Sequence, residues 1–197
     1  MRTFLRLCLP GCVLLGFAAC SQPAPAPASE DVMRPTATIK DIMDSIIAPA
    51  ADTLWESVAT IVTPSGIEER RPRTDEEWLV VRRSAVQLVE AANLLIVEGR
   101  HVAKPGERSV NPGIELHPEE IDKLIAEDRS TFVKLARAMQ DAALPAFQAI
   151  EAKNADGLSD AGEGIDVACE TCHMKYWYPN GGPPPESRPL PPLTPGN

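Results

Sequence analysis

Apolar residues recur at steps of three and four along residues 36–178, and no stretch there alternates convincingly between apolar and polar residues. Steps of three and four bring side chains to one face of an α-helix, whereas a half-buried strand needs alternation. The pattern therefore predicts one all-α domain over residues 36–178. The flanking segments lack it. Residues 21–35, rich in Ala and Pro, are typical of a tether, and residues 179–197, rich in Pro and Gly, of a disordered tail.

Two amphipathic segments form the first half of the domain. The first spans about residues 38–63, and Pro49 inside it is expected to kink or restart the helix, because proline lacks a donor and clashes with the preceding turn. The second opens with a capping box, Thr74 and Glu77, and is expected to stop near Gly99. Its inner face is Trp78, Val81, Ala85, Leu88, Ala92 and Leu95.

Two further helices follow a polar loop over residues 100–117. The third is expected to start at Pro118 and to bend or end at Pro145, with its apolar face continuing beyond that point. The fourth spans about residues 159–176. Four amphipathic helices with short to moderate connections predict an up-down-up-down four-helix bundle.

Residues 1–20 are typical of a bacterial export signal. Arg2 and Arg6 precede an apolar stretch, residues 7–17, that is too short to span a bilayer. Small residues then precede Cys20, which favours a lipoprotein signal in which this cysteine is lipidated. Ordinary signal cleavage without lipidation is the alternative. Both interpretations place the mature chain on the periplasmic side, and the favoured one anchors it to a membrane by lipid.

The segment CETCH, residues 169–173, carries the strongest chemical signal. Cys-x-x-Cys-His is the attachment pattern of a c-type haem: two thiols bond the porphyrin's vinyl groups and the histidine ligates iron. A zinc site or a reactive dithiol would also use two cysteines. Zinc would need further ligands, for which His101 and His117 are available, and a dithiol enzyme would need a βαβ pattern that the sequence lacks. The motif therefore predicts covalent haem c with its iron, in agreement with export.

A haem motif on the last of four helices resembles the cytochrome c′ family, the class II c-type cytochromes, over the whole predicted domain. The resemblance implies that Cys169 and Cys172 form the thioether bonds and that His173 is the proximal iron ligand. It also implies a haem-pocket contact for Tyr176, where the family often has an aromatic residue. The chain departs from the family at Trp177, because gas-binding members commonly carry Arg there.

The residue on the opposite side of the iron separates two functions. In the resembled family it comes from the first helix, where Met43 lies on the inner face. A methionine ligand gives six-coordinate iron suited to electron transfer, whereas an apolar residue leaves five-coordinate iron that binds nitric oxide or carbon monoxide. We expect Met43 to be the sixth iron ligand, with core packing as its alternative role. Electron transfer is thus the predicted function, and gas binding is the alternative.

The net charge and the catalytic motifs that the sequence lacks limit the binding partners and activities to be expected. The chain carries a net charge of −9, and loss of the export signal removes two arginines. This acidity argues against nucleic-acid binding. No catalytic triad, paired acid site or phosphate loop is evident, so we do not expect an enzyme. The expected partners are a redox protein, a membrane through the lipid anchor and, by the resemblance, a second copy in a homodimer. A structural lipoprotein whose CETCH binds no haem is the remaining alternative.

Overall fold

Helices make up most of the part of the chain that the computed structural model describes, residues 33–179 and 181, and a small two-stranded sheet completes it. The helices are α1 (Ile39–Ile42), the π-helix η1 (Met43–Ile47), α2 (Ala48–Glu56), α3 (Asp75–Leu95), α4 (Pro118–Glu127), α5 (Arg129–Glu151) and α6 (Ala155–Tyr176); the strands are β1 (Thr60–Thr63) and β2 (Gly66–Glu69).

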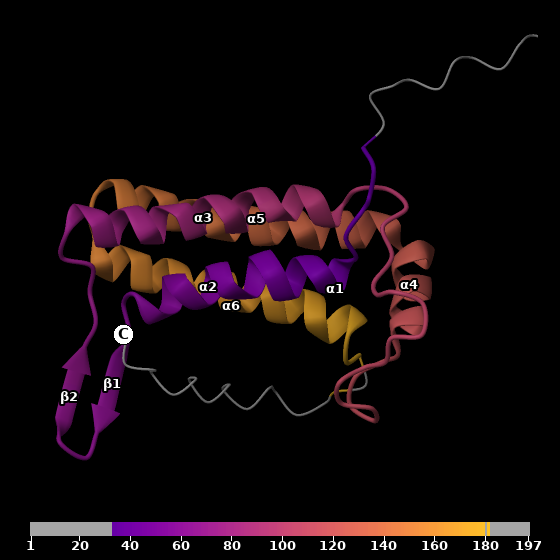
Figure 1. Ribbon diagram of the computed structural model, residues 1–197, viewed down its shortest axis with the longest axis horizontal. Helices are drawn as coiled ribbons and strands as arrows, with labels where there is room; N and C mark the ends of the chain where they lie inside the picture. Colours follow the sequence, from indigo (N-terminus) through magenta and orange to yellow (C-terminus); the bar gives the residue numbers. More distant parts are fainter. Residues whose placement is uncertain (1–32, 180, 182–197) are drawn as a thin grey trace, which may run out of the picture. The chain divides into compact units, whose positions relative to one another are not determined.

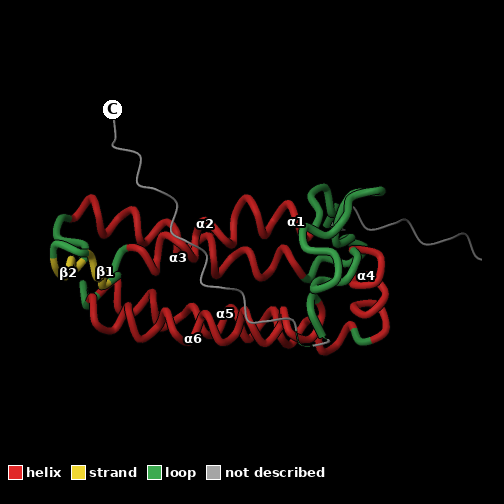
Figure 2. Tube along the Cα trace, turned by 90° about the horizontal axis from the view of Figure 1, so that it is seen from below, coloured by secondary structure: helices red, strands yellow, loops and turns green. Residues whose placement is uncertain are grey.

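The long helices pack against their neighbours in chain order. α2 contacts α3, α3 contacts α5, α5 contacts α6, and α6 returns to contact α2. Successive helices run in opposite directions, so α1 and the end of α6 lie at the same end of the molecule (Figure 1). The loop between α3 and α4 gathers at that end too, beside α4 (Figure 2).

The core forms where the apolar faces of these helices meet. The predicted inner face of the second helix is confirmed, because every one of its six residues is buried in α3. Thr74 also caps this helix as predicted: its side chain accepts from the amide of Glu77, whose carboxylate accepts from the amide of Thr74. The helix ends at Leu95, before the expected stop at Gly99, which adopts a φ of 76° in the turn beyond. A periodic apolar face therefore predicted this helix to within one turn.

The prediction of an entirely helical domain was wrong at residues 57–69. The first helical segment ends at Glu56, and β1 and β2 pair as an antiparallel hairpin in which Val62 faces Ile67. The run Thr60–Thr63 is rich in β-branched residues, which favour strands, and Gly66 follows the turn with a φ of 138° that other residues rarely adopt. A strand of four residues is too short to establish a period of two.

The predicted third helix is two helices. Asp128 has φ −135° and ψ 58°, which ends α4, and its side chain accepts a 3.2 Å hydrogen bond from the amide of Thr131 to cap α5. α5 does not end at Pro145 but runs through it to Glu151. The apolar face continues across the break, so periodicity alone did not reveal it.

Pro49 disturbs the first helix as predicted. The α-helical pattern changes at Met43 to a π-helix and resumes at Ala48, with Pro49 in the first turn of α2. Proline lacks an N–H and its ring crowds the preceding turn, so a change of helix type just before it is consistent with the expected disturbance. Single-turn π-helices within α-helices often accompany functional sites. Met43, the residue predicted to ligate iron, is the first residue of this one.

Several predictions concern residues outside those described. The export signal over residues 1–20, the lipidation of Cys20 and most of the tether and tail lie there and stay predictions. Within the described residues, no helix combines the length and the apolar character that crossing a bilayer requires.

Candidate functional site

The residues of CETCH occupy the last two turns of α6. Cys169 and His173 are four residues apart and Cys172 is three after Cys169, so all three lie on neighbouring positions of one face. Both thiols are free and half-buried against the apolar core. A helix thus presents two thiols and an imidazole together, as attachment of one porphyrin edge requires.

Burial determines the acidity of these thiols. It raises the pKa of Cys169 to about 12, with nearby Asp166 adding to the effect, and the pKa of Cys172 to about 11. A reactive dithiol needs the thiolate, which a lowered pKa provides. The environment of the two cysteines therefore disfavours the dithiol interpretation. Among the described residues, no group of three or more His, Cys, Asp or Glu side chains is placed to hold a metal ion.

His173 lies among polar and aromatic neighbours. Its Nδ1 is 3.5 Å from Oε1 of Glu170, one turn earlier. Its ring centroid is 6.3 Å from that of Trp177 and 6.2 Å from that of Tyr178. The side chain remains 34% exposed. Glu170 therefore faces Nδ1, and in the described part of the chain Nε2 makes no hydrogen bond or ion pair.

Tyr176, the predicted haem-pocket contact, is 2% exposed and packs edge-on against Phe132 with the ring centroids 5.6 Å apart. Its hydroxyl donates a 3.2 Å hydrogen bond to the carbonyl oxygen of Asp128, at the break between α4 and α5. Burial raises its pKa to about 12. These contacts anchor the end of α6 on α5, one turn from His173.

A hydrogen bond between the first and last helices fixes which residues of the two lie at the same height along their axes. Trp55 donates its Nε1–H to the carbonyl oxygen of Gly162 over 3.0 Å. α2 and α6 run in opposite directions (Figure 1). Met43 lies twelve residues before Trp55 and Met174 twelve residues after Gly162. At about 1.5 Å per residue, Met174 lies about 18 Å along α6 from the hydrogen bond, and Met43 lies slightly less than about 18 Å along the first segment, because a π-helix rises less per residue. Met43 is thus level with the His173 end of α6.

The two helical segments are close at α2 and apart at η1. No Cα atom of α1 or η1 lies within 8 Å of a Cα atom of α6, although both segments contact α3. The stripe of α6 that meets α2 at Gly162 continues through Asp166 and Cys169 to His173 in steps of four, three and four. One thiol and the imidazole therefore lie on the side of α6 that faces the first helical segment, where the backbones stay separate.

The loop between α3 and α4 joins these separated segments. The carbonyl oxygens of His101 and Val102 accept 2.9 Å hydrogen bonds from the first amides of α1, those of Ile39 and Lys40. The amide of Leu116 donates over 2.8 Å to the carbonyl oxygen of Trp177, just beyond α6. The loop thus holds the start of the first helix and the end of the last one by backbone hydrogen bonds.

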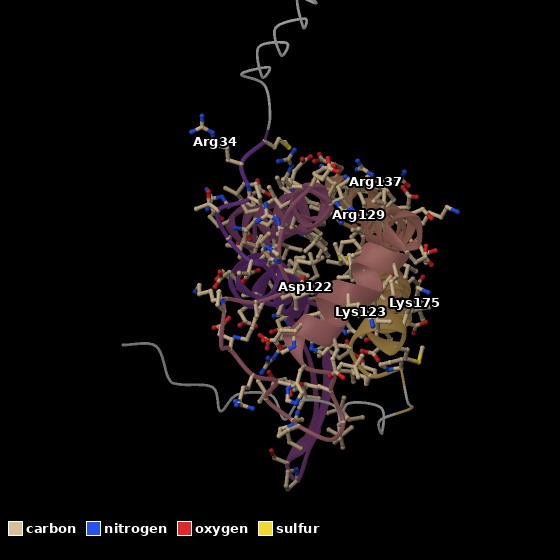
Figure 3. All side chains as sticks on the ribbon, turned by 90° about the vertical axis from the view of Figure 1, so that its right-hand side faces the viewer. Arg34, Asp122, Lys123, Arg129, Arg137 and Lys175 are labelled. Atoms are coloured by element: carbon tan, nitrogen blue, oxygen red, sulfur yellow. The ribbon has the colours of Figure 1, made fainter. Side chains whose placement is uncertain are left out.

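Asp122 of α4 holds the same loop from the other side. Its carboxylate accepts from the amide of Val102 over 2.8 Å and lies 3.2 Å from Nδ1 of His101. Figure 3 looks onto this end of the molecule, with Asp122 and Lys175 labelled. Lys175 lies 3.4 Å from Asp128 and extends over the ring of Tyr176, so it pairs away from His173.

The other histidines and methionines lie apart from the motif. His101 is exposed beside Asp122, and His117 caps α4, its amide donating to Glu120 over 2.8 Å. Met139 is buried in the core, and Met174 is 56% exposed. Met43 is half-buried and packs against the core, on a segment whose Cα atoms all lie more than 8 Å from those of α6. The structure therefore places Met43 level with His173 without bringing the two helices together, and its ligation stays a prediction.

Two residues near His173 were not singled out from the sequence, Glu170 and Tyr178. Glu170 lies inside CETCH, one helical turn before the histidine. This spacing could have predicted from the sequence that it lies beside His173. Tyr178 donates a 2.7 Å hydrogen bond to Glu170, and burial followed by this bond raises the pKa of its hydroxyl. Tyr178 follows the helix end, so its approach to Glu170 depends on how the chain turns back.

Among the described residues, a cavity of about 360 Å³ opens between α2 and α6, lined by Trp55, Val58, Ser159, Gly162, Glu163 and Asp166. It lies on the stripe that continues to His173 but contains no residue of CETCH.

Comparison with known proteins adds no assignment: no protein-family model, no curated protein and no solved structure matches this chain. The resemblance to cytochrome c′ rests on the motif and its place in the chain.

The residues present fit a covalently attached haem in their chemistry. Cys169 and Cys172 are unpaired thiols on one helical face, as thioether formation requires. His173 presents a nitrogen without a protein partner among the described residues. The first helical segment faces this group of residues across backbones that stay apart.

Proposed function

We propose that this chain is a c-type cytochrome that transfers electrons on the periplasmic side of a bacterial membrane. The proposal includes a four-helix bundle of the class II type, thioether bonds at Cys169 and Cys172, and iron ligation by His173 and Met43. One observation carries it: the free thiols and imidazole of α6 lie level with Met43, where η1 and α6 stay apart.

The role of each residue follows from its position. The two cysteines hold the group to the last helix, and His173 supplies Nε2 while Glu170 faces Nδ1. Met43 supplies a thioether from the opposite helix. When bound, haem supplies a ferric/ferrous couple, and the chain contributes ligand choice, burial and orientation rather than bond-making chemistry. The lipid anchor at Cys20 is the proposed attachment to the membrane.

Covalent attachment is the first test. The full-length chain is produced in a bacterium that matures c-type cytochromes, and its intact mass is compared with that of the double variant Cys169→Ser/Cys172→Ser. We expect the wild type to gain the mass of one haem, which acid and organic solvent do not remove, and the variant to gain none. A wild-type chain without covalent haem after maturation would leave the structural lipoprotein as the better assignment.

Axial ligation is the second test. We expect a low-spin ferric absorption spectrum with a far-red methionine–iron band that Met43→Ala abolishes. Met174→Ala is the matched control, because Met174 adjoins His173 but is exposed. A high-spin ferric wild type that readily binds carbon monoxide would overturn Met43 ligation and assign the protein to gas binding.

A further inference from the structure

Glu170 lies between two ring side chains at the end of α6. Its Oε1 is 3.5 Å from Nδ1 of His173, and its Oε2 accepts a 2.7 Å hydrogen bond from the hydroxyl of Tyr178. The carboxylate is 28% exposed, so it is partly withdrawn from water. One carboxylate thus contacts both His173 and a residue beyond the helix.

The backbone holds Tyr178 in this position. The amides of Trp177 and Tyr178 both donate to the carbonyl oxygen of His173, over 2.7 and 3.1 Å, which turns the chain back at the helix end. The carbonyl oxygen of Trp177 in turn accepts from the amide of Leu116 in the loop before α4. Tyr178 therefore reaches Glu170 from a turn whose backbone is held by these hydrogen bonds.

The chemistry of the three side chains indicates which ring nitrogen of His173 carries the proton. An ionised carboxylate only accepts hydrogen bonds, and a neutral imidazole carries a single N–H, on Nδ1 or on Nε2. A carboxylate beside Nδ1 favours the tautomer with the proton on Nδ1, which leaves the lone pair on Nε2. Histidines that ligate metals commonly donate their other N–H to a carboxylate, which orients the ring and raises its basicity.

We infer that Glu170 is a positioning residue, which holds His173 in the Nδ1–H tautomer and strengthens Nε2 as a ligand, and that Tyr178 moderates this effect by donating to the same carboxylate. The inference rests on the proposed function, since the ligand strength of Nε2 matters only if it binds iron. A stronger imidazole donor stabilises the ferric state, so Glu170 lowers the reduction potential and the Tyr178 hydroxyl raises it.

The test compares midpoint potentials of the full-length haem protein by spectroelectrochemical titration. Glu170→Gln keeps the size of the side chain but removes its charge, and we expect a more positive potential. Glu163→Gln is the matched control: the same change on the same helix, two turns earlier and exposed, with an expected shift several-fold smaller. Equal shifts in the two variants would overturn the role of Glu170.

Tyr178→Phe separates hydrogen bonding from charge, because it changes no formal charge. Without the phenol, the Glu170 carboxylate keeps its full accepting capacity for Nδ1 of His173, so we expect the potential to move in the negative direction, opposite to Glu170→Gln. A purely structural role would not produce shifts of opposite sign. A positive or absent shift in Tyr178→Phe would overturn the role of Tyr178.

The outcomes also distinguish this inference from the proposed function. Covalent haem is measured first on the wild type by intact mass. If none is attached, the proposed function fails and the inference fails with it. If haem is attached and the variants do not shift as described, the inference alone is wrong.

Discussion

The first half of α6 lies against α2. Its last turns lie opposite α1 and η1, from which they stay apart. At the close end, Trp55 bonds to the backbone of Gly162, and an added Cβ at Gly162 would lie 3.0 Å from Cδ1 of Trp55. At the separated end, no Cα atom of α1 or η1 comes within 8 Å of α6, and the loop before α4 joins the two segments by backbone hydrogen bonds. Glycine and a direct bond bring the same two segments together at one end, and a bridging loop holds them at the other.

The comparison shows that the last helix packs closely on the first helical segment at one end and stays apart from it at the other. The Trp55–Gly162 hydrogen bond aligns the first and last helices at one end, and the loop bonds to the backbone of both at the other end. Chemistry-bearing residues gather at the separated end, and the close end carries none of the predicted ligands. Substitutions at the two ends should therefore have different consequences.

The largest effect on stability is expected at the close end, from Gly162→Leu. Its side chain would overlap Trp55, so we expect a loss of about 1–3 kcal/mol in the free energy of unfolding by urea denaturation. Gly164→Leu is the control, because an added Cβ there meets nothing within 4 Å. The control should gain up to about 0.5–1 kcal/mol from helix propensity. Equal effects at the two glycines would show that the close approach does not constrain α6.

A smaller effect is expected at the separated end, from Asp122→Ala. Its carboxylate accepts from the amide of Val102 over 2.8 Å, and losing this bond should cost about 1.5 kcal/mol. The amide of Val102 should then exchange its hydrogen faster with solvent, because the loop loses an anchor. Asp141→Ala, an exposed site on α5, is the control. Unchanged exchange at Val102 would argue that the other loop bonds suffice.

The smallest effect is expected from an exposed ion pair that joins the start of α3 to the residues after α5, Asp75 with Lys153. The hydrogen bond from Lys153 holds the pKa of Asp75 below its usual value. Since the folded state binds this proton less readily than the unfolded state, the pair stabilises the fold above the ordinary aspartate pKa of about 3.9, and this stabilisation fades as the pH falls below it. The wild type should therefore lose its small advantage over Asp75→Asn on acidification.

Glu76→Gln, a change at the next residue in the same exposed turn, is the control for that pH series. Because exposed pairs contribute little, the comparison is best made at low ionic strength. An advantage over Asp75→Asn that stays constant from neutral pH down to about pH 2.5 would contradict the assignment, since the aspartate of the unfolded chain titrates within this window.

Several features could be predicted from sequence because short-range interactions determine them. The buried face of α3 and its cap at Thr74 follow from helical periodicity and one hydrogen-bonded turn. The arrangement of Cys169, Cys172 and His173 follows equally from their spacing, since a helix places residues three and four apart on one face. The three residues of the candidate site on α6 could thus be named from the sequence.

Other features could not be predicted, for different physical reasons. The hairpin after α2 is short, and Val58 and Ile61 continue the three- and four-residue spacing of the helix before it. Asp128 breaks a helix without breaking the apolar period, because α4 and α5 both contact α6. The contact of Tyr178 with Glu170 depends on the turn beyond Tyr176, which spacing does not specify.

By itself, the sequence determined a mostly helical domain and a last helix that presents two thiols and an imidazole on one face, because residues a few positions apart on a helix have no other relative arrangement. Only the tertiary structure decided that Met43 lies level with His173, that η1 stays apart from α6, and that Glu170 lies between His173 and Tyr178. These relations join residues far apart in the chain or across a helix end, so they depend on packing, on the Trp55–Gly162 hydrogen bond and on the loop that closes the separated end.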